Sequence, residues 1–303
     1  MIARLLQSAE GKVAPSLSAC VMVGGEVRLL WNPARVYDLA SLTKVLCTSE
    51  LALRLASDGR LALDRGHPLW SPGVTARQLL QHSAGCLWWK ELWKIPGVDV
   101  PTRGDIVNHA LREPLVSAPG ERHAYSDLGF LALGAAIEAV GGAPIDQLWS
   151  APGLSWGHPG AEPTGEGPDG VVNDLNARAM GGVAAHAGLF GTAEAVARQV
   201  QRWIDGKVPL IDAIDARGAG SHALGWDTPS GELSSAGAHP PSDALGHTGF
   251  TGTSAWFSRS LGLVAVLLSN RVAYGRDPAK IRALRHAWHG EAWSLAAPAR
   301  SAG

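Results

Sequence analysis

The sequence predicts an α/β (α+β) protein whose antiparallel β-sheet comes from both chain ends, is flanked by helices and carries an inserted, mostly helical region. Residues 18–31 and 253–269 both have the apolar, β-branched composition of paired strands, although they lie at opposite ends of the chain. Between them, apolar residues recur mainly with helical spacing. We therefore expect one domain, with a sheet part at about residues 1–57 and 190–303 and a helical part at about residues 58–189.

The N-terminal part predicts a helix, a hairpin and a second helix. Residues 2–10 have the pattern of a short helix. Residues 18–23 and 26–31 are separated by Gly24-Gly25, a two-residue turn that suits glycine because its backbone needs positive φ. Residues 41–57 are rich in leucine at helical spacing, so we expect a helix there.

The middle of the chain is predominantly helical. We expect helices at residues 105–111 and 128–140, and the second ends at Gly141-Gly142, a typical helix C-terminus. Residues 151–170 are rich in glycine and proline and predict a long loop. A further helix is expected at residues 193–205.

The C-terminal third predicts strands followed by a helix. Residues 222–228, 253–258 and 261–269 have strand composition, and the last two are close enough in sequence to pair. A helix at residues 278–289 follows them. Together with the N-terminal hairpin, these strands would complete the sheet.

Composition limits the possible functions. Of the 303 residues, 17% are charged and 46% hydrophobic, which is typical of a soluble globular protein. The net charge of −1 gives no general attraction to nucleic acid or anionic lipid. We therefore expect neither nucleic acid nor a membrane as a partner, and the sequence does not indicate an oligomeric state.

The cysteines and the N-terminus bear on the compartment. Cys20, Cys47 and Cys86 are an odd number without disulfide or metal-site spacing, which fits a reducing compartment. The tetrapeptide at residues 17–20 resembles a lipoprotein cleavage site, but charged residues and proline interrupt the apolar run that a signal segment needs. We expect a cytoplasmic protein, or a periplasmic one if Met1 replaces a removed signal.

The tetrapeptide Ser41-Leu42-Thr43-Lys44 is the first candidate for chemistry. Residues three apart share a helix face, so the Lys44 ammonium can approach the Ser41 hydroxyl. The positive end of the helix would also stabilise a developing alkoxide. This pattern alone is weak, because an N-capping serine followed by a solvated lysine gives the same sequence.

Two later motifs support the catalytic interpretation. Tyr125-Ser126-Asp127 precedes the helix at residues 128–140, and His247-Thr248-Gly249-Phe250 is expected to open the penultimate strand. With Ser41-Leu42-Thr43-Lys44, and with residues 79–85 and 186–193, they make the chain resemble the serine β-lactamase and penicillin-binding protein superfamily. The resemblance is to its class C-like branch, which includes esterases and D,D-peptidases, and runs from about residue 37 to 270.

The resemblance implies a role for each motif. Ser41 would be the acylated nucleophile, Lys44 its proton partner and Tyr125 the general base. The backbone N–H groups of Ser41 and Phe250 would form the oxyanion hole. The expected substrate-binding residues are Asp127, His247, Thr248 and Gly249.

Two positions depart from the common family pattern. His247 replaces a lysine, and since histidine titrates near pH 6.5, anion binding is expected to weaken at alkaline pH. We expect a charged His247, together with Lys44, to lower the pKa of Tyr125 towards neutrality. Asp127 replaces an asparagine and cannot donate a hydrogen bond when ionised. Both changes argue against efficient β-lactamase activity.

The expected function is hydrolysis of a small ester, amide or peptide through a Ser41 acyl-enzyme, with neither cofactor nor metal. The alternatives are a D-alanyl-D-alanine peptidase or weak β-lactamase and, in another class, a catalytically silent homologue that binds a ligand or partner. His82 and His186 are expected to be structural. Trp88, Trp89 and Trp93 could line an acyl pocket or pack in a helical core.

Overall fold

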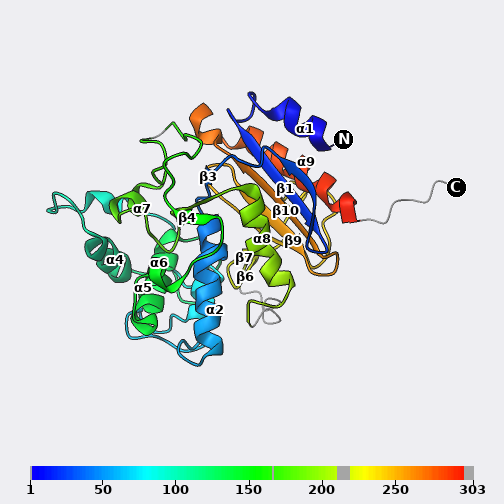
Figure 1. The fold of residues 1–303 in the computed structure, drawn as a ribbon. Coiled ribbons are helices and arrows are strands. Elements are labelled where there is room, and N and C mark those ends of the chain that lie inside the picture. Colours follow the sequence, from blue (N-terminus) through cyan, green and yellow to red (C-terminus); the bar gives the residue numbers. More distant parts are fainter. Residues whose placement is uncertain (1, 166, 210–218, 297–303) are drawn as a thin grey trace.

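A seven-stranded antiparallel sheet forms the centre of the computed structural model, which describes residues 2–165, 167–209 and 219–296 (Figure 1). The strand order is β2-β1-β10-β9-β8-β7-β6. The strands are β1 (Leu17–Val23), β2 (Glu26–Trp31), β6 (His222–Ala223), β7 (Trp226–Asp227), β8 (Leu245–Thr248), β9 (Ser254–Ser258) and β10 (Leu263–Ser269).

The two chain ends meet at the middle of this sheet. β1 pairs with β10 from Leu17 opposite Ser269 to Val23 opposite Leu263. β2 and β9 extend the sheet on either side. The predicted sheet from both termini, including the hairpin around Gly24-Gly25, is therefore confirmed.

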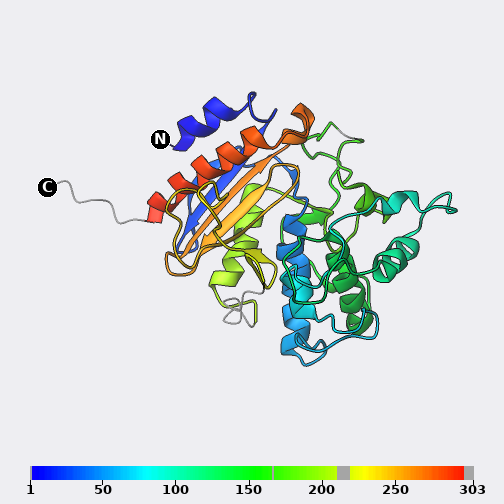
Figure 2. The same cartoon turned by 180° about the vertical axis from the view of Figure 1, so that it is seen from behind.

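Both faces of the sheet are buried. Along β1, Cys20 and Met22 belong to the core that contains α8, whereas Ala19 and Val21 belong to the core beneath α1 and α9. Successive side chains of a strand point to opposite faces, so a strand covered on both sides must be apolar throughout. Figures 1 and 2 show α8 on one face and α1 with α9 on the other. These helices are α1 (Ile2–Ala9), α8 (Ala193–Ile204) and α9 (Ala279–Trp293).

A helical region lies beside the sheet (Figure 2). It also contains a small antiparallel sheet of order β3-β5-β4. The helices are α2 (Ser49–Ser57), α3 (Ala76–Leu80), α4 (Arg103–Arg112), α5 (Asp127–Gly141), α6 (Ile145–Leu148) and α7 (Leu175–Ala179), and the small strands are β3 (Tyr37–Asp38), β4 (Leu154–Trp156) and β5 (Leu189–Gly191). Short 3₁₀ turns span Leu92–Lys94, Arg271–Tyr274 and Ser294–Ala296.

Three predicted elements differ locally from the structure. Residues 222–228 form the β6–β7 hairpin rather than one strand, because the backbone reverses at Leu224 and Gly225, both with positive φ. A Cβ at Gly225 would collide with Ser49, so only glycine allows this close approach. The predicted loop at residues 151–170 contributes the short strand β4.

The predicted helix at residues 41–57 is the third difference. It begins with a π-helical turn at Lys44–Thr48 before α2 starts at Ser49. Such wider turns are frequent at functional sites, and this one carries Lys44.

Candidate active site

A strained turn presents Ser41. Ala40 has φ +48°, which is unusual for a residue with a side chain. The Asp38 carboxylate holds the turn, because its two oxygens accept the N–H groups of Ala40 at 2.8 Å and of Asn173 at 2.6 Å. The turn therefore fixes the backbone directly before the predicted nucleophile.

The third motif packs against the same turn. His247 and Thr248 end β8 instead of opening the following strand, so that expectation was wrong. The turn after them docks on the nucleophile segment, since Thr251 donates to Asp38 O at 2.8 Å and Thr253 donates to Leu39 O at 3.1 Å. A Cβ at Gly249 would collide with Thr253 Oγ1, which explains a glycine here.

Lys44 lies at the base of the site. Its side chain has no exposed area, and its ammonium nitrogen is 2.9 Å from Ser41 Oγ and 2.7 Å from Asp127 Oδ1. It also donates to His186 O at 3.0 Å. Burial disfavours the ammonium, but the negative charge of Asp127 and the contact with Tyr125 prevail and raise the pKa of Lys44. The resting group is a cation.

Tyr125 joins this cluster from the segment before α5. The Lys44 ammonium lies 5.1 Å from the centre of the Tyr125 ring. Burial is the largest influence on this phenol and raises its pKa, although the neighbouring Lys44 and Ser41 act in the opposite direction. The expectation of a pKa lowered towards neutrality was therefore wrong: the resting phenol is neutral.

His247 differs in charge from the sequence expectation. The pKa of His247 lies well below its usual value. Burial is the main cause, and the neighbouring His222 and Lys44 act in the same direction. The ring is therefore neutral at physiological pH, and neither a cationic His247 nor an alkaline loss of its charge is expected.

A cleft of about 900 Å³ collects the predicted residues. Lys44 lies buried beneath it, and the other predicted site residues line it: Ser41, Tyr125, Asp127, His247, Thr248, Gly249 and Phe250. The three tryptophans also line the cleft, and Trp88 is 64% exposed. The acyl-pocket interpretation of Trp88, Trp89 and Trp93 is thus favoured over core packing.

Sequence reasoning missed the arginines that hold the third motif. Arg285 donates to Gly249 O and Thr253 O, both at 2.7 Å, and Arg271 donates to Phe250 O at 3.0 Å. Arg285 lies in α9, where a single arginine in a helical pattern reads as a solvated side chain. No sequence motif could have identified its role, because the contact depends on how α9 packs on the sheet.

The two histidines expected to be structural have backbone and charge partners. His82 accepts the Ser126 N–H at 3.0 Å on Nδ1. His186 Nε2 is 2.8 Å from Asp174 Oδ1, while its carbonyl accepts from Lys44. Both residues position neighbours of the predicted catalytic groups.

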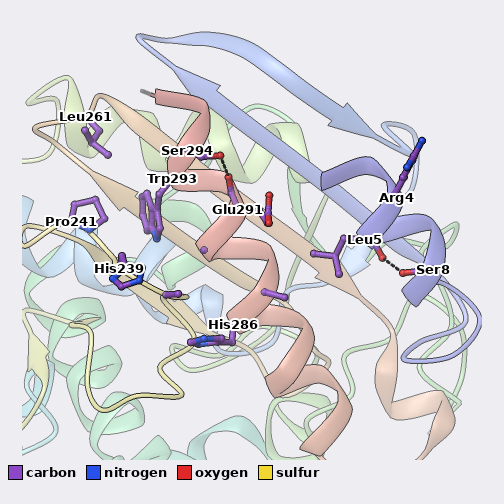
Figure 3. A pocket seen from close by; sticks show the side chains of 13 residues that line it. Arg4, Leu5, Ser8, His239, Pro241, Leu261, His286, Glu291, Trp293 and Ser294 are labelled. Atoms are coloured by element: carbon purple, nitrogen blue, oxygen red, sulfur yellow. Dashed lines mark hydrogen bonds between the residues drawn. The ribbon is translucent and has the colours of Figure 1, made fainter. Parts of the chain in front are cut away.

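A second hollow, of about 1050 Å³, lies near α1 and α9 (Figure 3). Arg4, His286 and Trp293 are among its lining residues. None of the predicted site residues lines it. The chemistry of the sequence motifs therefore gathers in the first cleft alone.

Comparison with known proteins identifies the family of this chain. The Beta-lactamase family model matches residues 2–287, so the chain belongs to the β-lactamase family of hydrolases. The chain is 26% identical to the N-acetylmuramyl-L-alanine amidase of Bacillus subtilis (strain 168), over 80% of this chain and 70% of that protein. It is 27% identical to an Escherichia coli (strain K12) protein named "Putative D-alanyl-D-alanine carboxypeptidase", over 78% and 69%.

The fold also matches solved structures. A β-lactamase from Mycobacterium bovis superposes with a TM-score of 0.70 at 19% identity, covering 98% of this chain and 99% of that one. The predicted fold class and the family resemblance are both confirmed. Among the described residues, no helix has the length and apolar character needed to cross a membrane.

Proposed function

We propose that this hydrolase cleaves an ester or amide through an acyl-enzyme on Ser41, with Lys44 and Tyr125 as the proton-transfer groups. The observation that carries the proposal is the buried Lys44 ammonium, 2.9 Å from Ser41 Oγ and paired with Asp127. A buried cation is costly unless a specific partner compensates it. The buried positive charge of Lys44 lies beside Ser41 Oγ, which supports a reactive rather than a structural role for Ser41.

The proton path follows from the resting charges. Lys44 is an ammonium and Tyr125 a neutral phenol, so a proton acceptor must come from elsewhere. Asp127 Oδ1 lies 2.7 Å from Lys44 Nζ and takes a proton from it, which leaves an amine that removes the Ser41 proton. Ser41 Oγ then forms its bond to the substrate carbonyl carbon.

Collapse of the tetrahedral intermediate breaks the bond to the leaving group. Tyr125 donates its phenolic proton to that group and is reprotonated by Lys44, which recovers a proton from Asp127. The proton lost by Ser41 thus ends on the leaving group, and the resting charges return. Water then attacks the acyl-enzyme, and the same groups act in reverse.

The oxyanion hole is proposed at the backbone N–H groups of Ser41 and Phe250. Asp38 fixes the turn that carries Ser41, and Arg271 fixes the Phe250 carbonyl. Rigid donors stabilise a developing oxyanion because they need no reorganisation during the reaction. Thr248 and Gly249 on the same edge, with His247, would contact the substrate, while Asp127 is occupied by Lys44.

A second candidate is hydrolysis of a D-alanyl peptide. It is favoured by the relative named "Putative D-alanyl-D-alanine carboxypeptidase". Both reactions are acyl transfers to Ser41, so they share the mechanism above. A panel of p-nitrophenyl esters, D-alanyl peptides and nitrocefin would rank the substrates.

Covalent labelling tests the proposed nucleophile. A fluorophosphonate should label the wild type once, and peptide mass spectrometry should place the label on Ser41. Ser41→Ala should lose labelling and at least about a thousandfold of turnover, whereas Ser8→Ala on exposed α1 should behave as wild type. An unlabelled wild type would favour the catalytically silent homologue, and full labelling of Ser41→Ala would disprove the assignment.

A further inference from the structure

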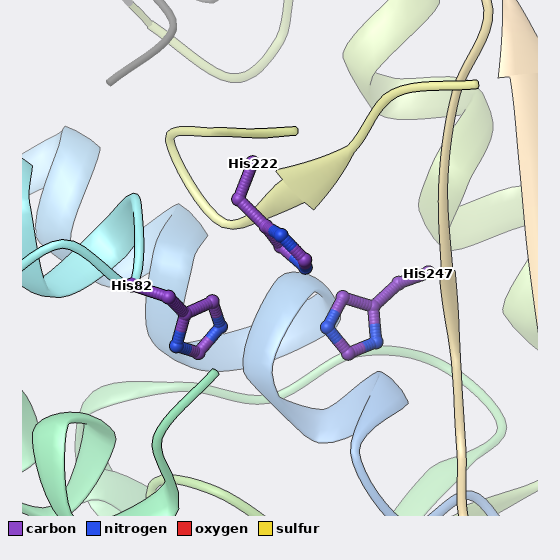
Figure 4. A group of neighbouring side chains, drawn as sticks. All are labelled: His82, His222 and His247. Carbon is purple, nitrogen blue, oxygen red and sulfur yellow. The ribbon is translucent and has the colours of Figure 1, made fainter. Parts of the chain in front are cut away.

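Three buried histidines converge beside Tyr125 from separate parts of the chain. His82 follows α3, His222 belongs to β6 and His247 to β8, and Figure 4 shows their rings turned towards one another. One potential ligand nitrogen from each ring lies within 4.8 Å of the others. The exposed fractions are only 2%, 7% and 2%. Within the described part of the chain, no other group of histidine, cysteine or acidic side chains meets this description.

Three of the six ring nitrogens lack a protein partner. They are His82 Nε2 and both ring nitrogens of His247, which are buried without a hydrogen-bond partner among the described residues. Buried polar atoms left unpaired cost free energy, so they call for an explanation. A ligand between the rings would occupy one nitrogen of His82 and one of His247.

His222 has the arrangement expected of a metal ligand. Its Nδ1 lies 3.0 Å from His123 Nε2, and the two rings are stacked. If His222 donates this hydrogen, its Nε2 is left as a free acceptor that faces the other two histidines. Metal-binding histidines commonly hold their second nitrogen in this way, which fixes the tautomer and the ring orientation.

We propose that His82, His222 and His247 bind one divalent transition-metal ion of the zinc type. Imidazole nitrogen suits zinc, copper and nickel, whereas calcium and magnesium prefer oxygen. Zinc–nitrogen bonds of about 2.0–2.1 Å place tetrahedral ligands roughly 3.3 Å apart, so the rings must approach by about 1 to 1.5 Å. Small rotations of the side chains can supply this closure.

The site is distinct from the proposed hydrolytic steps, none of which uses an ion. It lies next to them, however, since the His82 and Tyr125 ring centres are 4.3 Å apart. His222 and His247 also line the catalytic cleft, so solvent can reach the ion and occupy its fourth position. The sequence suggested no metal because the three histidines are far apart along the chain.

The His82 proton makes the proposal specific. Ser126 donates to His82 Nδ1, so the neutral ring carries its proton on Nε2, the nitrogen that faces the cluster. Coordination through Nε2 therefore requires the other neutral tautomer, in which the proton is on Nδ1 and the hydrogen bond from Ser126 is lost.

Calorimetry with ZnCl₂ on the chelator-treated full chain tests the site, with the visible spectrum of a Co²⁺ titration as a second readout. The wild type should bind one ion per chain. His222→Ala should weaken binding at least about a hundredfold, and His123→Phe about tenfold or more. His109→Ala, which changes an exposed histidine of α4, should bind as the wild type does.

Each outcome decides the proposal. Circular dichroism of the metal-free variants confirms that they are folded, and Ser41→Ala should retain binding, so the metal site and the nucleophile are tested independently. The proposal is overturned if the wild type shows no saturable binding or if His222→Ala binds as tightly as wild type. A His82→Ala variant that binds as tightly as the wild type would exclude His82 and with it the three-histidine site.

Discussion

Burial has opposite outcomes for the charge of the side chains on the two sides of the cleft floor. On one side Lys44 is fully buried yet remains an ammonium, because Asp127 lies 2.7 Å away and Ser41 and the His186 carbonyl accept its other hydrogens. On the other side His82, His222 and His247 are equally buried, and the pKa of each is lowered, with burial as the main cause. Lys44 keeps its charge because an opposite charge lies within hydrogen-bond distance, whereas the three histidines have no such partner at that distance among the described residues.

Removing the cation should have the largest effect. Lys44→Met keeps the length of the side chain but leaves the Asp127 charge without its partner and Ser41 without its proton acceptor. We expect turnover to fall by about four orders of magnitude and stability by about 3–5 kcal/mol. Steady-state kinetics and urea unfolding measure the two effects.

The matched control breaks an exposed ion pair. Lys90→Met removes the partner of Glu113 at the surface, where such a pair contributes little. It should leave turnover unchanged and stability within about 1 kcal/mol. If Lys44→Met and Lys90→Met changed turnover and stability to the same extent, the burial of the Lys44 charge would have no role in function.

Tyr125→Phe tests the proton donor between the two sides. It keeps the ring beside His82 but removes the hydroxyl that contacts Ser41 and Lys44. The turnover number should fall by two to four orders of magnitude with little change in melting temperature. Tyr274→Phe, which removes an exposed hydroxyl, is the control. A nearly active Tyr125→Phe would leave Lys44 and Asp127 as the only proton-transfer groups.

The charges of Asp127 and His247 should also determine which substrates the protein prefers. Asp127 is held by Lys44 and His247 is neutral, so positions 127 and 247 supply neither the amide nor the cation that the family pattern often has there. Nitrocefin turnover should therefore be at least about tenfold slower than that of short-chain esters. Parallel measurement of kcat/KM for both substrates decides this, and a faster lactam reaction would restore the β-lactamase interpretation.

Asp38 is a buried acid whose contribution to stability should depend on pH. Burial raises its pKa to about 6, although the Asn173 and Ala40 N–H groups act against this. The folded chain thus holds the proton more tightly than the unfolded chain, so the contribution of Asp38 to stability is complete below about pH 4 and is lost as the pH rises through 6. The loss is on the order of 3 kcal/mol.

Urea unfolding of wild type and Asp38→Asn from pH 4 to 7 measures this contribution. The stability of the wild type relative to the variant should decrease with rising pH, because asparagine does not titrate. Asp64→Asn provides a control of opposite sign, since the hydrogen bond from Arg77 lowers the pKa of the exposed Asp64. A pH-independent difference for Asp38→Asn would show that Asp38 is already ionised at pH 4.

Local sequence patterns sufficed for most elements. The hairpin at residues 18–31 was predictable because its apolar strands and glycine turn are determined by adjacent residues, and α5 because its spacing and terminal glycines are local. The β6–β7 hairpin was not, since Leu224 adopts a positive φ, which the strand-like composition around a leucine does not indicate. The same holds for Arg285, whose contact with the third motif requires α9 to lie on the sheet.

The sequence by itself determined the fold class, the family and the residues that meet at Ser41. Strand alternation, helical spacing and the three motifs can each be recognised within a short segment of the chain. The protonation states of Lys44, Tyr125 and His247, and the meeting of His82 with His222, were decided only by the tertiary structure. The physical reason is that burial and opposing charge act through space: a side chain's pKa depends on neighbours that the chain brings together only when it folds.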